Sequence, residues 1–280
     1  MIIDAHTHIF PENIKNSRTS YFNSEKEFEL LYKQPGSKLC TAEELIESMD
    51  KNEIDKSIVF GFPWNKKETA EFHNDYIIEK YEKYHDRLIP FACFNPVKEY
   101  AQKEALRCIR NGFKGLGELA LYKSDFTDEI LDKITSVMNA AEEKSLPVMF
   151  HTNEEAGHDY PGKAPVTIKG TLDFIQRFKS NRLILAHLGG GTLFFNLLKN
   201  PPDMKNAVFD TAALPFLYKK SIYKLIENSE LEDKIIFGSD WPLINPGRYF
   251  REIESNVVSK EFKEKIFYKN ISDFLYKNKE

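Results

Sequence analysis

Two histidines one residue apart stand near the start of the sequence, in Asp4-Ala5-His6-Thr7-His8. Alternate residues of a strand point to the same face and lie roughly 6.5 Å apart along the chain, so both imidazoles can bind one metal ion. A lone His-x-His is weak evidence for a metal site. The ends of later apolar runs supply four more side chains of ligand type: Glu118, His151, His187 and Asp240. Together, the six residues predict a metal centre.

Eight short apolar runs are the candidate strands that would carry these side chains. Their ranges are 2–6, 54–62, 88–95, 113–119, 146–151, 182–188, 207–211 and 234–239. Several of these runs are continuously apolar, as expected of parallel strands that are covered on both faces.

The segments between the runs have helical periodicity. Thr41-Ala42-Glu43-Glu44 has the form of a capping box, and an apolar stripe follows it. Further helices are expected at 66–84, 98–111, 128–144, 168–178, 216–229 and 261–276, with a short one at 194–198. Eight strands alternating with eight helices predict an α/β fold in which residues 1–280 form a single (β/α)₈ TIM barrel. An open doubly wound sheet is the second interpretation, but no Gly-x-Gly-x-x-Gly follows the first strand.

Two long connections interrupt this repeat, at 11–39 and 153–166. Both leave the C-terminal ends of strands, where barrel active sites lie, so we expect both to be active-site loops. The first contains Phe28, Leu30, Leu31 and Tyr32, which suit a short helix over the barrel mouth. Candidate substrate contacts are His158 and Tyr160 in the second loop and Trp64 after the second strand, although Trp64 is equally suited to packing at the rim.

The ligand types indicate what the metal would be. Nitrogen and carboxylate donors without thiolate suit Zn²⁺, which we expect, and also Mn²⁺, Fe²⁺ or Co²⁺. A catalytic site leaves one position for water, whose pKa the ion lowers toward ~7. One or two ions fit the six residues.

The same motifs resemble the amidohydrolase superfamily, in the branch called amidohydrolase 2 or predicted metal-dependent TIM-barrel hydrolase. The matching motifs are Asp4 to His8, Gly117-Glu118, Phe150-His151, Ala186-His187-Leu188-Gly189-Gly190-Gly191, Gly238-Ser239-Asp240-Trp241-Pro242 and Asn270-Ile271. The resemblance extends over essentially the whole chain and is poorly specific for substrate.

The resemblance implies a role for each site residue. His6, His8, His151 and Asp240 would be metal ligands or direct neighbours of the metal, and His187 a second-metal ligand or a group that polarises the substrate. Glu118 stands where binuclear relatives have a carboxylated lysine or a bridging glutamate. Asp240 would also act as general base toward the attacking water.

Three functions remain open. The first is a metal-dependent hydrolase that attacks an amide, lactone or ester-like bond of a small polar metabolite, and Glu118 favours it. The second is a metal-dependent, non-oxidative decarboxylase of an aromatic or unsaturated carboxylate, because members of this branch use one metal with the same ligand types. The third is a barrel that binds a ligand without catalysis, although none of the expected ligands is missing.

Composition excludes other classes of protein. Lys and Arg number 39 against 43 Asp and Glu, a formal charge of −4 that gives no broad basic surface for nucleic acid. No apolar run approaches the ~20 residues that span a bilayer, and we expect a cytoplasmic protein with a small-molecule substrate. Relatives often form homodimers, but no interface signature is visible.

Three further expectations concern residues outside the six-residue set. The three cysteines, Cys40, Cys93 and Cys108, lack a disulfide or zinc spacing, and we expect buried thiols. His73 and His85 lie in or after a charged segment and are expected to be solvated. The glycines at 189 to 191 are expected to let the backbone turn close to the site.

Overall fold

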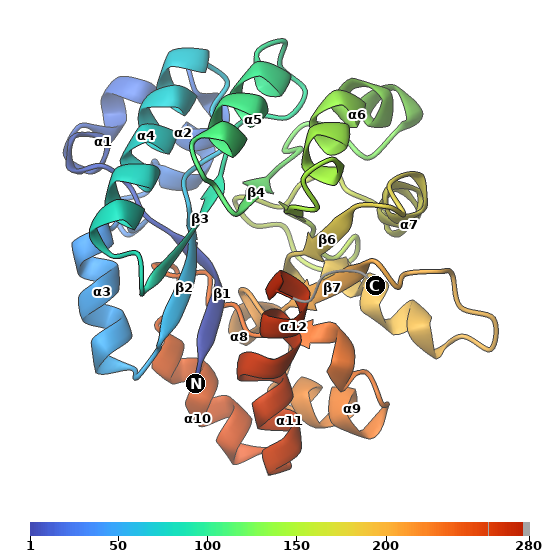
Figure 1. The fold of residues 1–280 in the computed structure, drawn as a ribbon. Coiled ribbons are helices and arrows are strands. Elements are labelled where there is room, and N and C mark those ends of the chain that lie inside the picture. The colour runs from blue at the N-terminus through green and yellow to red at the C-terminus, as the bar shows by residue number, and fades with distance from the viewer. Residues whose placement is uncertain (257, 277–280) are drawn as a thin grey trace.

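A barrel of eight parallel strands forms the centre of the computed structural model, which describes residues 1–256 and 258–276. The strands follow one another around the sheet in chain order, as the sequence predicted. Helices surround them (Figure 1). The strands are β1 Ile3–His8, β2 Lys56–Phe60, β3 Leu88–Ala92, β4 Gly115–Leu119, β5 Pro147–Phe150, β6 Arg182–Leu185, β7 Ala207–Asp210 and β8 Ile235–Ile236.

The barrel closes where the end of the chain meets its beginning. Strand β8 is short, but the segment after it continues beside β1. The Ala5 N–H donates to the Phe237 carbonyl at 2.8 Å, and the His8 N–H donates to the Trp241 carbonyl at 2.7 Å. This pairing places Asp240 next to the two histidines of β1.

Helices connect the strands across the outside of the barrel. They include α3 Ala42–Lys51, α4 Lys67–Lys83, α5 Ala101–Arg110, α6 Asp128–Glu142 and α7 Ile168–Arg177. The predicted capping box of α3 is confirmed: the Glu44 N–H donates to Thr41 Oγ1, and the Glu44 carboxylate accepts from the Thr41 N–H. None of the helices in the described part of the chain is long and apolar enough to cross a membrane.

Two short helices and a 3₁₀ turn lie in the first long loop. They are α1 Glu12–Asn16, the 3₁₀ turn Arg18–Tyr21 and α2 Lys26–Tyr32. Helix α2 is the one expected over the barrel mouth. Its Phe28 is fully buried, and Leu31 and Tyr32 line the cavity described below.

The last third of the chain differs from the prediction. The expected helix 216–229 is two helices, α8 Leu214–Leu217 and α9 Ile222–Asn228, because the backbone at Tyr218 is extended. Helix α10 Pro246–Ser255 was not predicted. It begins at Asn245, whose side chain accepts from the Gly247 N–H, with Pro246 at its first position.

The remaining elements finish the chain. Residues 260–276 form α11 Lys260–Glu264, a π-helical turn Lys265–Lys269 and α12 Asn270–Tyr276, within the helix expected at 261–276. A further 3₁₀ turn spans Glu232–Lys234. The short helix expected at 194–198 is instead the end of a 3₁₀ segment, His187–Leu197.

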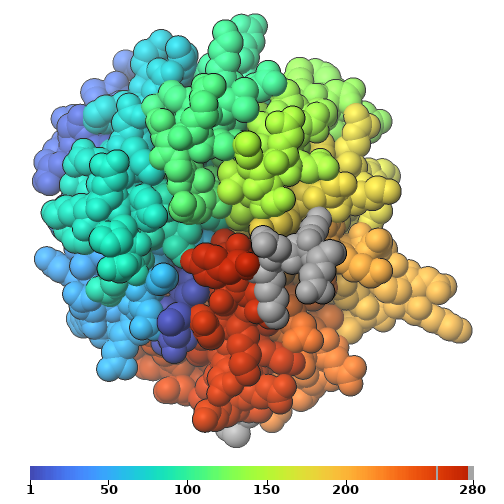
Figure 2. Space-filling model, viewed as in Figure 1, coloured from blue at the N-terminus to red at the C-terminus, as the bar shows by residue number. Residues whose placement is uncertain are grey.

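A small apolar cluster fills the barrel interior below the site. Ile3, Phe60, Phe91 and Met149 belong to it, and Ile271 of α12 packs beneath them. Gly115 leaves the space that the Phe91 ring occupies, since a Cβ there would lie 2.5 Å from that ring. The C-terminal helices cover the centre of this end of the barrel, beside the start of the chain (Figure 2). The site can therefore open only at the opposite end.

Candidate active site

A bulge in β1 directs both histidines into the barrel. The pairing of β1 with β2 shifts register between Asp4 and Thr7. Ile3 and Ala5 point inward before the shift, and His6 and His8 point inward after it, 5.0 and 4.7 Å from the ring of Phe60. The predicted His-x-His pair is thus on one face, at the C-terminal end of the barrel.

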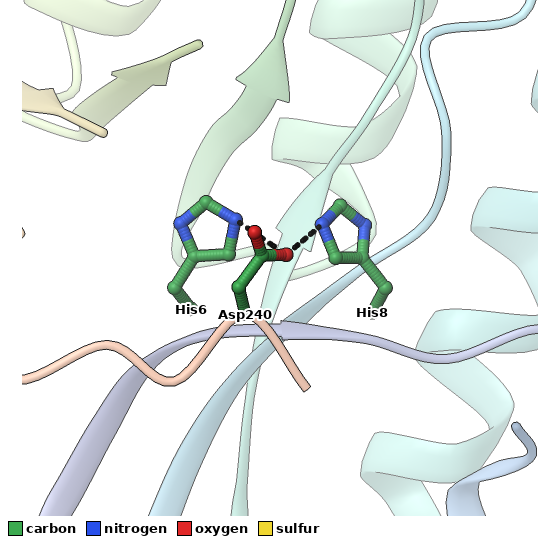
Figure 3. A group of neighbouring side chains, drawn as sticks. All are labelled: His6, His8 and Asp240. Atoms are coloured by element: carbon green, nitrogen blue, oxygen red, sulfur yellow. Dashed lines mark ion pairs between the residues drawn. The ribbon is translucent and has the colours of Figure 1, made fainter. Parts of the chain in front are cut away.

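Asp240 completes a first group of three. Its Oδ1 lies 3.4 Å from His8 Nε2 and 3.7 Å from His6 Nε2. Figure 3 shows the carboxylate between the two imidazole rings. The Asp240 N–H donates to the His6 carbonyl, so the backbone pairing that closes the barrel also holds this side chain in place.

Glu118, His151 and His187 form a second group beside the first. Glu118 Oε1 lies 3.1 Å from His151 Nδ1 and 3.8 Å from His187 Nε2. Its other oxygen, Oε2, lies 3.7 Å from Nε2 of both His6 and His8. Glu118 therefore joins the two groups, and the structure brings all six predicted residues together.

In every histidine of the cluster, one ring nitrogen lies within hydrogen-bond distance of an acceptor outside the cluster. His8 Nδ1 lies 3.0 Å from the Gly61 carbonyl, His187 Nδ1 2.8 Å from the Ala212 carbonyl, and His151 Nε2 3.0 Å from the Gly162 carbonyl. A ring nitrogen that donates to such an acceptor leaves the other nitrogen directed at the site, where it can bind a metal ion once it carries no proton. These second nitrogens of the four rings face one common centre.

Asp210, at the end of β7, is the acceptor for His6 and was missed by the sequence reasoning. Its Oδ2 lies 2.8 Å from His6 Nδ1, and its Oδ1 accepts from the N–H groups of His187 and Ala212. The residue is fully buried. A signal for it was present, because it is an acidic residue at the end of a predicted strand, like the predicted ligands.

The electrostatics follow from burying histidines among carboxylates. Burial raises the pKa of Glu118, but His6 and His151 outweigh it and lower this pKa to about 2. Burial likewise opposes ionisation of Asp240, yet its hydrogen bond to His8 and the charge of His6 bring its pKa well below the usual range. Burial lowers the pKa of His6, but Glu118 and Asp210 outweigh it and raise this pKa to about 10. Both cavity-facing carboxylates are therefore ionised at neutral pH.

These donors fit a divalent cation. His6 Nε2 is buried and has no hydrogen-bond partner within the described residues. His151 Nδ1 and His187 Nε2 lie 3.3 Å apart, a separation that two ligands of one metal ion can have. Imidazole nitrogens and carboxylates are the donors that Zn²⁺, Mn²⁺ and similar ions accept.

A cavity of about 550 Å³ lies over the cluster. Five of the six cluster residues line its floor, all but His6. Both long loops contribute to its wall, including the predicted His158 and Tyr160. Much of the remaining wall is aromatic or apolar, with Tyr32, Phe62, Tyr122, Phe216, Leu31 and Leu243.

Trp64 and His73 differ from these wall residues. Trp64 is fully buried against Phe28 and Phe62 and is not among the cavity-lining residues, so rim packing is the role that the structure supports. His73 is buried, and the expectation that it is solvated was wrong. It accepts from Trp64 Nε1 at 2.9 Å and contacts the Ile9 carbonyl at 2.7 Å, which satisfies both ring nitrogens inside the protein. His85 is exposed, as expected.

The structure confirms the expectation for the glycines at 189 to 191 and confirms in part the expectation for the cysteines. Leu188 and the glycines at 189 to 191 all have positive φ, and a Cβ on Gly190 would lie 2.1 Å from the Asn153 carbonyl. Glycine thus permits a close approach beside the site. Cys93 and Cys108 are buried, whereas Cys40 is partly exposed, and the Cys93 thiol donates to the Glu118 carbonyl at 2.9 Å.

The sequence of this site matches a known family. The model of the amidohydrolase family called Amidohydro_2 matches residues 3–275. The chain belongs to this family. Because the match covers nearly the whole chain, it confirms the resemblance that the motifs of the sequence indicated. A search of curated proteins found no match.

Solved structures similar to this chain include two decarboxylases and a probable hydrolase. 5-Carboxyvanillate decarboxylase of Novosphingobium aromaticivorans, with manganese and 4-hydroxy-3-methoxy-5-nitrobenzoic acid, has a TM-score of 0.75 at 17% identity, covering 98% of this chain and 96% of that one. Dihydroxybenzoic acid decarboxylase of Polaromonas, with manganese and 2-nitroresorcinol, has a TM-score of 0.67 at 17% identity, covering 100% and 98%. A probable 2-pyrone-4,6-dicarboxylic acid hydrolase of Acinetobacter baumannii has a TM-score of 0.62 at 13% identity, covering 98% of each chain. At these identities the likeness shows the barrel fold.

Proposed function

We propose that this protein is a metal-dependent, non-oxidative decarboxylase of a small aromatic carboxylate. The observation that carries the proposal is the aromatic wall directly above the histidine and carboxylate cluster. The rings of Phe62 and Tyr122 are stacked with planes 13° apart, and Tyr122 lies 5.4 Å from the ring of His151. A planar ring can bind against such faces while its carboxylate reaches the cluster.

The cluster would hold one divalent ion through His6, His8, His151 and Asp240, with His187 beside it. Manganese in the similar decarboxylases supports Mn²⁺ as well as the expected Zn²⁺. When bound, the ion would supply positive charge to the substrate oxygens.

Asp240 is the group that we assign to proton transfer. In decarboxylation the bond between the ring and the carboxylate breaks, its electron pair stays on the ring carbon, carbon dioxide leaves, and that carbon takes a proton. Asp240 is ionised, and its side chain is more exposed to the cavity than that of Glu118, at 14% against 5%. Its carboxylate can accept a proton from a hydroxyl of the substrate and return it to the ring carbon.

The test is carbon dioxide release from a panel of hydroxybenzoates and unsaturated acids, with Mn²⁺ or Zn²⁺ added. We expect release with at least one oxygenated benzoate, and a loss of about 10²-fold or more in kcat for Asp240→Asn at saturating metal. The matched control is Asp203→Asn, an exposed aspartate outside the cavity lining. Turnover of lactones or esters with no release of carbon dioxide would contradict the proposal.

Hydrolysis is the second candidate, and the position of Glu118 favours it. This carboxylate lies between the two groups of the cluster, with one oxygen toward His6 and His8 and the other toward His151. A carboxylate between two metal ions would occupy such a position in a binuclear hydrolase. The substrate would then be a lactone, amide or ester with an unsaturated or aromatic body that suits the same wall.

A further inference from the structure

His151 differs from the other histidines of the cluster in what holds it. Gly61 and Ala212, which hold His8 and His187, directly follow strands β2 and β7. Gly162, which holds His151 Nε2 at 3.0 Å, lies in the long loop between β5 and α7. The direction in which His151 Nδ1 points therefore depends on the conformation of a loop.

Asn153 fixes this loop near Gly162. Its side-chain oxygen accepts from the Ala164 N–H at 2.7 Å, and its Nδ2 donates to the Ala164 carbonyl at 3.1 Å. Asn153 is 3% exposed. One buried amide thus pairs with both backbone groups of a residue two positions after Gly162. The close approach of Gly190 to the Asn153 carbonyl holds Asn153 from the other side.

The same loop carries the predicted substrate contacts. His158 and Tyr160 line the cavity, and so does Gly162 itself. The Tyr160 hydroxyl donates to Glu154 at 3.1 Å, a second bond across the loop. A loop position that presents His158 and Tyr160 to a substrate is thus also the position that presents the Gly162 carbonyl to His151.

We propose that Asn153 is a positioning residue that orients His151 through the Gly162 carbonyl and so couples the loop over the substrate to metal affinity. The inference rests on the metal site proposed above. Coupling of this kind is reciprocal, so an ion bound at His151 must also stabilise the loop.

The first experiment measures Mn²⁺ binding from the electron paramagnetic resonance signal of free Mn²⁺. We expect Asn153→Ala to weaken Mn²⁺ binding about 10-fold. Loss of a group that orients a metal-binding residue typically lowers metal affinity about 10- to 100-fold, and Asn153 acts on His151 only indirectly. The matched control is Asn181→Ala, because Asn181 is equally buried and donates to the Met138 carbonyl, but lies at the opposite end of the barrel, before β6. It should change the Kd less than about 2-fold. In a His151→Ala background, Asn153→Ala should have no further effect, since it acts through His151.

The second experiment measures amide hydrogen exchange in residues 160–166, and it uses the milder Asn153→Ser in case Asn153→Ala does not fold. Mn²⁺ should slow exchange of this segment in the unaltered protein and fail to do so in Asn153→Ser. Equal Mn²⁺ affinity in the Asn153 and Asn181 variants, or Mn²⁺ protection that survives in Asn153→Ser, would overturn the coupling while leaving the proposed function intact. Failure of the unaltered protein to bind Mn²⁺ or Zn²⁺ would overturn both.

Discussion

The four histidines of the cluster use one nitrogen for orientation and leave the other for the site. The acceptor that contacts the first nitrogen fixes the tautomer of the ring and raises the basicity of the nitrogen that binds the metal. Among the four acceptors, Asp210 is the only side chain, and it also accepts from the N–H groups of His187 and Ala212. This single buried side chain therefore orients parts of both groups.

Asp210→Asn should weaken metal binding about 10- to 100-fold. In the variant, the amide N–H of Asn faces His6 Nδ1 and cannot accept a hydrogen bond from it. The imidazole proton then moves from Nδ1 to Nε2, the nitrogen that faces the metal. Isothermal titration with Zn²⁺ or Mn²⁺ would measure the effect. Asp203→Asn, which changes an exposed aspartate, is the control, and an unchanged Kd in Asp210→Asn would show that Asp210 does not set the tautomer.

Glu118→Ala distinguishes the two candidate reactions by metal content. If one ion is held by His6, His8, His151 and Asp240, elemental analysis should find about one ion per chain in both the unaltered protein and the variant. Two ions per chain that fall to one or none in the variant would instead indicate a bridged, hydrolytic site.

His73 makes the stability of the protein depend on pH. Burial lowers its pKa to about 4, with the Ile9 carbonyl only partly opposing this. Since the unfolded state takes up the proton from about pH 6.5 downward, stability is complete above that pH and is lost as the pH falls toward 4. Between pH 7.5 and 5 the loss should be ~2 kcal/mol. Urea unfolding in EDTA, compared with His73→Gln, measures this difference, which should be absent in the variant.

His73 and Asp210 were missed in the sequence for two different physical reasons. Ala70, His73, Asn74 and Ile77 form the buried stripe of α4, at helical spacing, but two of the four are polar and the helix around them is charged. A stripe defined by apolar residues alone does not include His73. Asp210 was overlooked because its partner, His6, lies near the other end of the chain, and only closure of the barrel brings the two together.

At the scale of elements, a buried carboxylate joins the start of α2 to the barrel, beside the packing of Phe28. Glu25, just before α2, accepts from the Asn65 and Lys66 N–H groups after β2, at 2.8 and 2.9 Å, and also from the Asn65 side chain. Helix α2 then supplies Leu31 and Tyr32 to the cavity wall. The position of this wall therefore depends on Glu25.

Glu25→Ala should lower the free energy of unfolding by about 3 kcal/mol, because it leaves buried N–H groups without an acceptor. It should also raise the KM for substrate by moving Leu31 and Tyr32. Glu29→Ala on the same helix is the control, since Glu29 makes only partly exposed ion pairs with Lys26 and Lys33 and should change the free energy of unfolding far less. Equal losses in the two variants would contradict this role of Glu25.

The elements themselves were largely predictable, and the exceptions have local causes. Continuous apolar runs gave all eight strands, because parallel strands are buried on both faces. Helix α10 was missed although Asn245 and Pro246 are a recognisable start, because its buried residues, Tyr249 and Ile253 among them, are few. The break between α8 and α9 depends on the backbone at Tyr218, for which the apolar pattern gives no signal.

At the scale of the whole molecule, the proposed ion would link strands from around the entire barrel. A ligand that binds only the folded state adds RT ln(1 + [L]/Kd), which is ~2.7 kcal/mol at 100 times the Kd. For a chain of this size that amounts to roughly 5 °C in Tm. Calorimetry with EDTA and then with excess Mn²⁺ or Zn²⁺ should show a rise of this size. No rise in the unaltered protein, or an equal rise in a His6→Ala variant, would argue against the site.

The closure of the barrel between β1 and the segment after β8 also sets when the site can form during synthesis. His6 and His8 leave the ribosome first, whereas Asp240 follows only after most of the chain has been made. At roughly 5–20 residues per second, the two histidines wait on the order of tens of seconds for their carboxylate partner. Most of the barrel must therefore be synthesised before the complete set of metal ligands exists, and metal binding is a late event in the synthesis and folding of each molecule.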